Sequence, residues 1–142
     1  MKYVVYYWSR YGNGKKIVDY LSEILKKNSH DVEVLRTDEA DPANVPEGDF
    51  YVFSAPAEAF SVQRDMKGFM KKLEGVDGKR YGLINTHGMK RNWLGKMEKI
   101  LSKKNMEIVA KVDFKVGDGV KTGDGLPDDW KNSINDFSSK IM

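Results

Sequence analysis

The chain has 142 residues, of which 40% are hydrophobic and 32% are charged, as is typical of one globular domain and not of a disordered chain. It contains no cysteine, which excludes disulfides, thiolate metal sites and cysteine-ligated iron–sulfur clusters, so redox chemistry would need a bound organic cofactor. The formal net charge of +3 is spread along the chain without a basic run interleaved with aromatic residues, and we expect no nucleic-acid partner.

Short apolar runs alternate with helical patterns in the first half of the chain. Residues 3–8 are almost continuously apolar and predict a strand buried on both faces. A helix is expected over about residues 13–27, where apolar residues recur at helical spacing. Residues 31–36 and 50–53 then predict two further strands, and the apolar stripe over residues 66–73 predicts a second helix.

The alternation continues to the end of the chain. Residues 80–86 predict a fourth strand, and residues 106–116 predict a fifth. The helix between these strands has a predicted core face made of Trp93, Leu94, Met97, Ile100 and Leu101. After a glycine-rich loop, Pro127 is suited to the first turn of a last helix, whose buried face runs from Trp130 to Ile141.

This series of elements predicts an α/β domain covering residues 1–142, with helices on both faces of a parallel sheet. The second and fifth strands alternate apolar and polar residues, so we expect them at the edges of the sheet. A doubly wound five-stranded sheet of order 2-1-3-4-5 places those two strands at its edges. No apolar run approaches the roughly 18 residues of a membrane span, and the first residues lack a signal-peptide pattern, so the expected location is cytoplasmic, without a membrane partner.

The segment between the first strand and the first helix is the strongest candidate for a ligand site. In this type of sheet, ligands bind beyond the carboxyl ends of the strands, between the first and third strands. The glycines of this segment let the backbone approach an anion, and the exposed amides at the start of a helix favour a phosphate. Ser9 and Tyr11 hydroxyls and the Asn13 amide can add hydrogen bonds.

Other phosphate-binding loops fit this segment poorly. A Walker loop would need glycine in place of Ser9 and a hydroxyl residue in place of Lys16. A dinucleotide fingerprint would need a third glycine or an alanine where Ile17 stands. The aspartates of the later glycine-rich loop lack the spacing of an EF-hand, so we interpret them as a turn and an acidic helix start, with no metal site.

The run Tyr-Tyr-Trp-Ser-x-x-Gly-Asn resembles the first strand and phosphate loop of the short-chain flavodoxins. Ser9, Gly12 and Asn13 match that loop, whereas Tyr11 and Gly14 replace two of its threonines. The resemblance implies a three-layer flavodoxin-like sandwich that binds FMN. It also implies a phosphate site made of Ser9, Arg10, Tyr11, Gly12, Asn13, Gly14 and Lys15.

The resemblance covers essentially the whole chain, through two further loops that would hold the flavin ring. The loop after the third strand contributes Ser54, Ala55, Pro56, Ala57 and Phe60, with Ala59 near a position where many relatives have glycine. The loop after the fourth strand contributes Thr86, His87, Gly88, Met89 and Trp93. Phe60 and either His87 or Met89 are the expected ring contacts. Alternatively, Phe60 and Trp93 are core residues and His87 is a solvated loop residue.

The resemblance implies an electron carrier that shuttles electrons between redox partner proteins. Two alternatives stay open: an FMN-dependent reductase of a small acceptor, and a flavin-free binding module, so the sequence does not decide whether the protein is an enzyme. We also expect partner proteins with an acidic docking surface, because five cations lie in or beside the three loops, namely Arg10, Lys15, Arg64, Lys90 and Arg91.

Overall fold

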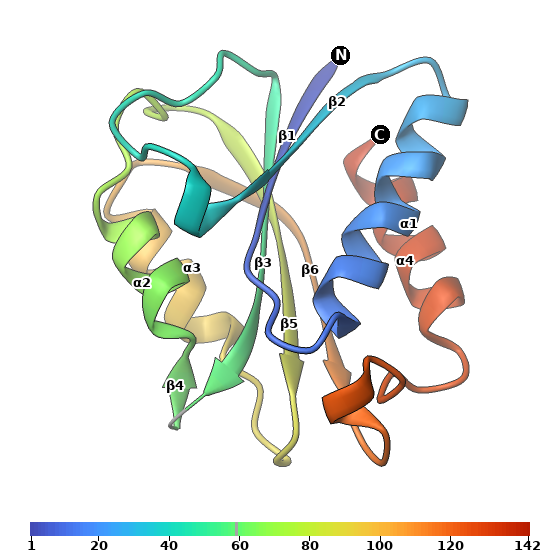
Figure 1. Ribbon diagram of the computed structural model, residues 1–142. Helices are drawn as coiled ribbons and strands as arrows, with labels where there is room; N and C mark the ends of the chain where they lie inside the picture. The colour runs from blue at the N-terminus through green and yellow to red at the C-terminus, as the bar shows by residue number, and fades with distance from the viewer. Residues whose placement is uncertain (59) are drawn as a thin grey trace.

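The computed structural model describes residues 1–58 and 60–142, and it has three layers. A central sheet lies between two pairs of helices, with α1 and α4 on one face and α2 and α3 on the other (Figure 1). The helices are α1 (Asn13–Lys27), α2 (Arg64–Lys71), α3 (Leu94–Ser102) and α4 (Trp130–Ile141). Two short 3-10 helices, η1 (Thr37–Glu39) and η2 (Val120–Thr122), lie in connecting segments.

The sheet confirms the predicted order of parallel strands. The strands are β1 (Lys2–Tyr7), β2 (Asp31–Arg36), β3 (Phe50–Glu58), β4 (Ser61–Val62), β5 (Arg80–His87) and β6 (Glu107–Lys115). The parallel strands lie side by side in the order β2-β1-β3-β5-β6, which is 2-1-3-4-5 when these five are counted along the chain. β2 and β6 form the edges, as their alternating patterns predict.

Two boundaries differ from the sequence-based expectation. β3 continues through residues 54–58, which we expected to form a loop, because Ala55 and Pro56 pair with β5 and residues 57–58 pair with β4. The two-residue antiparallel β4 is too short to leave a periodic pattern. Pro127 precedes the last helix instead of lying in its first turn, and its carbonyl accepts a hydrogen bond from the Trp130 N–H, where α4 begins.

Two apolar cores lie on the two faces of the sheet, because successive strand residues point to opposite faces. From β1, Val4 and Tyr6 pack in the core beneath α2 and α3, while Tyr3 and Val5 pack in the core beneath α1 and α4. Among the helices of the described residues, none has the length and apolar character that crossing a bilayer requires.

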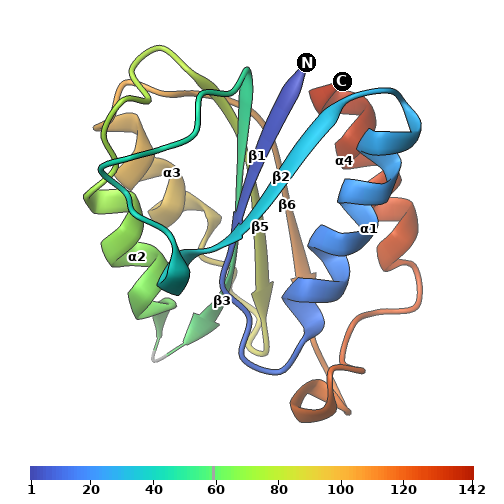
Figure 2. The same cartoon turned by 45° about the horizontal axis from the view of Figure 1, so that its top comes forward.

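The connecting loops at the carboxyl ends of the strands gather at one edge of the molecule, the lower edge in Figure 1. Both chain termini lie at the opposite edge (Figures 1 and 2). The segments that follow β1, β3, β5 and β6 therefore lie close together at the carboxyl ends of the parallel strands.

Candidate functional site

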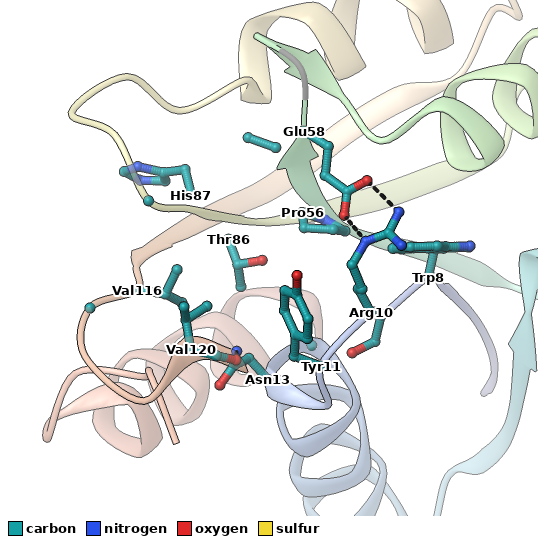
Figure 3. A pocket seen from close by; sticks show the side chains of 15 residues that line it. Trp8, Arg10, Tyr11, Asn13, Pro56, Glu58, Thr86, His87, Val116 and Val120 are labelled. Carbon is teal, nitrogen blue, oxygen red and sulfur yellow. Dashed lines mark hydrogen bonds and ion pairs between the residues drawn. The ribbon is translucent and has the colours of Figure 1, made fainter. Parts of the chain in front are cut away.

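A cavity of about 730 Å³ lies over the carboxyl ends of the central strands, and its walls come from the loops after β1, β5 and β6 and from the last residues of β3 and β5 (Figure 3). This volume is within the usual range for a site that holds a small molecule or cofactor. The predicted residues that line it are Ser9, Arg10, Tyr11, Asn13, Gly14, Pro56, Ala57, Thr86, His87 and Gly88. The cavity therefore lies at the switch point that the strand order predicts.

The loop after β1 presents the start of α1 to this cavity. Gly12 caps the helix with φ of 100°, a left-handed conformation that glycine adopts without strain. The Ser9 hydroxyl oxygen accepts hydrogen bonds from the Gly12 N–H (3.1 Å) and the Lys15 N–H (3.4 Å). Within the described part of the chain, the N–H groups of Asn13 and Gly14 have no acceptor, and the first turn carries no acidic residue. Unpaired amides at the positive end of a helix favour an anion.

Arg10 joins this loop to the end of β3. Its guanidinium donates two hydrogen bonds to the Glu58 carboxylate, at 2.7 and 2.8 Å, and it lies 4.8 Å from the centre of the Trp8 ring (Figure 3). The hydrogen bonds and charge of Glu58 raise the pKa of Arg10 above its ordinary value. Neither Trp8 nor Glu58 was among the predicted site residues, although both line the cavity.

The fourth loop, residues 116–125, is a cavity wall that we did not predict from the sequence. Val116, Gly117 and Val120 line the cavity, whereas we interpreted this glycine-rich loop only as a turn. The Asn13 side chain holds the loop at two points: its amide nitrogen donates to the Val120 carbonyl (2.9 Å), and its oxygen accepts from the Gly125 N–H (3.0 Å). The predicted topology could have indicated this cavity wall, because the loops after all parallel strands lie at the same end of the sheet, where the ligand site is.

A second tie between α1 and this loop is ionic. The Lys16 ammonium lies 3.0 Å from the Asp124 carboxylate, and its hydrogen bond lowers the pKa of that carboxyl. Gly123 has φ of +80°, and a Cβ atom there would lie 2.8 Å from the Tyr11 carbonyl oxygen. The loop therefore packs directly against the phosphate-type loop, and only glycine permits this approach.

Replacing Asn13 with alanine should loosen the fourth loop. The two hydrogen bonds of Asn13 together predict a loss of about 1–3 kcal/mol in the free energy of unfolding. The Gly125 amide, which donates to Asn13, should exchange its hydrogen faster with solvent. Urea denaturation and hydrogen-exchange NMR measure both effects. The control is Asn132→Ala on the exposed face of α4, which should change stability by no more than about 0.5 kcal/mol. If the Gly125 amide exchanges its hydrogen at the same rate in Asn13→Ala, Asn13 does not hold the fourth loop in place.

A second cavity of about 590 Å³ adjoins the first and shares Ala57, Glu58, His87 and Gly88 with it. Its other walls include Phe60 and Met89, which are expected ring contacts, and Trp93, a further predicted site residue. The Phe60 side chain is 77% exposed, so the alternative that it is a core residue is wrong. Its φ of 60° is uncommon for a bulky residue, and such backbone conformations concentrate at functional sites.

His87 and Trp93 have structural contacts in the loop after β5. His87 is 4% exposed, and its two ring nitrogens lie 2.6 Å from the Asp113 carboxylate and 2.5 Å from the Met89 carbonyl oxygen. The alternative of a solvated loop histidine is therefore wrong. Trp93 caps α3 and packs partly against the core beneath α2 and α3, while Met89 is 64% exposed. Met89 and Phe60 are thus the two exposed apolar side chains that line the second cavity.

Asn85 is a further residue that sequence reasoning missed. It is fully buried in β5, where its amide nitrogen donates to the Ala55 carbonyl and its oxygen accepts from the Trp93 N–H, both at 2.9 Å. Asn85 thus fixes the end of β3 relative to the loop after β5. The sequence could have pointed to Asn85, because it is a polar residue inside an otherwise apolar strand and a buried amide needs hydrogen-bonding partners.

Four predicted site residues line neither cavity: Gly12, Lys15, Ser54 and Ala55. Ser54 and Ala55 are buried in β3, where the Ser54 carbonyl accepts a hydrogen bond from the Trp8 N–H. The Lys15 ammonium pairs with Asp19, at 2.7 Å, one helical turn along α1. Ala59, which we expected near the flavin ring, lies outside the described residues.

A 2-1-3-4-5 parallel sheet with a cofactor-sized cavity over β1 and β3 defines a doubly wound α/β protein with its site at the switch point. The sequence matches the family model of the flavodoxins over residues 5–130. The chain belongs to the flavodoxin family. No curated protein matches the sequence at a significant level.

Solved structures of flavodoxins share this fold over nearly the whole chain. A flavodoxin from the domain Archaea is 18% identical with a TM-score of 0.74, over 99% of both chains. A flavodoxin from Streptococcus pneumoniae TIGR4 is 16% identical with a TM-score of 0.75, over 99% of this chain and 97% of that one. Rubredoxin:oxygen oxidoreductase from Desulfovibrio gigas gives a TM-score of 0.82 at 13% identity, but this chain spans only 35% of its length.

Proposed function

We propose that this protein binds one FMN noncovalently and carries electrons between redox partner proteins. The observation that supports this proposal best is the pair of adjoining cavities, which differ in chemistry. The first opens on the unpaired amides at the start of α1, and the second is bordered by the apolar side chains of Phe60, Met89 and Trp93. FMN consists of an anionic phosphate group and a flat aromatic ring. The first cavity offers N–H donors for the phosphate and the second offers apolar surface for the ring, so the residues present fit FMN.

Each group of residues has a distinct task in this proposal. The segment 9–15 would hold the phosphate through its backbone N–H groups. Phe60 and Met89 would contact the faces of the ring, and Asn85 holds the last part of β3 against the loop after β5. Bound FMN supplies transfer of one or two electrons. Because Phe60 and Met89 are exposed, the second cavity lies at the molecular surface, where a partner protein can approach.

A reductase of a small acceptor is the second candidate function. The second cavity favours it, because Lys90 and Arg91 line this cavity together with the apolar side chains. A flat anionic acceptor would find both apolar surface and positive charge there. The two candidates differ in turnover: a reductase oxidises NADH or NADPH continuously when an acceptor such as a quinone is present, whereas a carrier does so only when a separate reductase is added.

FMN binding itself is tested with the purified protein. Absorbance between 300 and 550 nm before and after addition of FMN, and calorimetric titration, should show one FMN per chain. Riboflavin, which lacks the phosphate, should bind about 10- to 100-fold more weakly, because charge-assisted hydrogen bonds to the phosphate are lost. If FMN produces neither heat nor a bound spectrum, the protein is a flavin-free binding module. Equal affinity for FMN and riboflavin would show that the segment 9–15 does not hold the phosphate.

A further inference from the structure

Two apolar side chains protrude from the rim of the second cavity. Phe60, between β3 and β4, is 77% exposed, and Met89, in the loop after β5, is 64% exposed. They are the two most exposed large hydrophobic side chains among the described residues. Both line the same cavity, so they form one apolar patch and not two scattered residues. An exposed apolar patch beside a ligand site is typical of a protein-binding surface.

Two cations without an ion pair among the described residues lie beside this patch. Lys90 and Arg91 line the same cavity and are exposed, and no carboxylate of residues 1–58 or 60–142 lies within ion-pair distance of either. The Arg91 guanidinium lies 4.3 Å from the centre of the Trp93 ring, which holds this cation at the cavity wall. Arg64, the first residue of α2 after β4, is also exposed and has no ion pair in the described part of the chain.

Two of the five cations expected at the docking surface, Arg10 and Lys15, are paired within the chain. Arg10 pairs with Glu58, which is the acidic residue in the wall of the second cavity. Lys15 pairs with Asp19, and Asp113 accepts from buried His87. The sequence-based expectation treated Arg10 and Lys15 as part of a positive docking surface. The ion pairs restrict that surface to Arg64, Lys90 and Arg91.

We propose that the surface formed by Phe60, Met89, Lys90 and Arg91, with Arg64 at its margin, docks a partner protein whose contact face carries carboxylates around an apolar centre. This inference rests on the proposed function, because an electron carrier must bring the edge of its cofactor close to its partner. An apolar centre with a charged rim is the usual composition of a protein–protein interface. A single-stranded nucleic acid would instead need cations along a groove that tracks its backbone.

The positive charges of this surface predict a weak, salt-sensitive complex with the partner protein. Carriers form small, short-lived interfaces, so opposite charges serve mainly to raise the rate of association. Attraction between solvent-exposed charges acts over about 10 Å at 0.1 M salt and is screened further as salt rises. Docking on this surface should therefore weaken steadily as ionic strength increases.

The test uses three short synthetic peptides of equal length, made of glutamate and leucine, glutamate and serine, or lysine and leucine. Amide shifts of the protein, with and without FMN, are recorded by NMR during titration with each peptide. The glutamate–leucine peptide should bind most tightly, with shifts confined to the segment after β3 and to residues 88–93. Its affinity should fall at least about 10-fold in Lys90→Glu/Arg91→Glu, since two attractions become repulsions.

The matched control is Lys26→Glu/Lys27→Glu, which reverses two adjacent exposed lysines at the far end of α1. It changes the net charge equally and should alter the affinity by less than about 2-fold. Equal losses in both double variants, or shifts spread over lysines of the whole surface, would overturn the proposal. Tighter binding of a single-stranded oligonucleotide to the same residues would overturn it in favour of a nucleic-acid site. Localised peptide binding in a protein that fails to bind FMN would support the docking surface and overturn the electron-carrier function.

Discussion

Replacing Gly12 with valine should lower the affinity for FMN by at least about 100-fold, a loss of about 2.7 kcal/mol. Gly12 has φ of 100° where the loop after β1 turns into α1. A β-branched residue at such an angle costs of order 1–3 kcal/mol, and the loop relieves this strain by leaving the conformation that directs the helix amides into the cavity. Beyond the adjoining backbone, no heavy atom of the described residues lies within 4 Å of a Cβ built at Gly12, so the effect comes from the backbone conformation and not from a clash with a neighbouring segment. Calorimetric titration with FMN measures the loss.

Gly75→Val is the matched control. Gly75 also has positive φ, +76°, and a Cβ built there likewise meets nothing within 4 Å. It lies between α2 and the start of β5, at the amino ends of the parallel strands, whereas the cavities lie at their carboxyl ends. The two variants should lose similar amounts of stability in urea, while only Gly12→Val loses affinity for FMN. Normal FMN binding by Gly12→Val would show that the phosphate lies elsewhere.

Replacing buried Asn85 with leucine should lower the free energy of unfolding by about 2–4 kcal/mol. The Ala55 carbonyl and the Trp93 N–H would each lose a hydrogen bond, and each unpaired buried group costs about 1–3 kcal/mol. Because Asn85 links the last part of β3 to the loop after β5, which both border the second cavity, FMN affinity should fall as well. Urea denaturation followed by circular dichroism measures the first effect, and titration with FMN measures the second.

The control for Asn85 is Asn44→Leu. Asn44 is exposed, and its side-chain amide donates a hydrogen bond to the nearby Asp41 carboxylate. Its replacement should change stability by no more than about 0.5 kcal/mol, as is usual at the surface. If Asn85→Leu is as stable as the unaltered protein, leucine must pack well enough to offset both lost hydrogen bonds. Unchanged FMN affinity in a destabilised Asn85→Leu would show that the loops do not depend on this link.

Local patterns were sufficient to predict the loop after β1 and the ends of the neighbouring strands. Ser9, Asn13 and Gly14 reach the first cavity because they follow a central strand directly. Their partners could not be predicted in the same way. That Arg10 pairs with Glu58, or that Asn13 holds Val120 and Gly125, depends on segments 48 to 112 positions apart that only the completed sheet brings together.

The sequence by itself determined the strand order and the edge at which a ligand would bind. Continuous apolar runs require burial on both faces, alternating runs require an edge, and parallel strands bring their carboxyl ends to one rim. Only the tertiary structure decided which side chains face the cavities and which serve the fold. Ser54 and Ala55 continue β3 because β5 offers them hydrogen-bonding partners, and His87 is buried because Asp113 of β6 lies beside it. The exposure and charge pairing of a residue depend on its neighbours across the sheet. These neighbours are distant in the chain, so the residues next to it in the sequence do not reveal them.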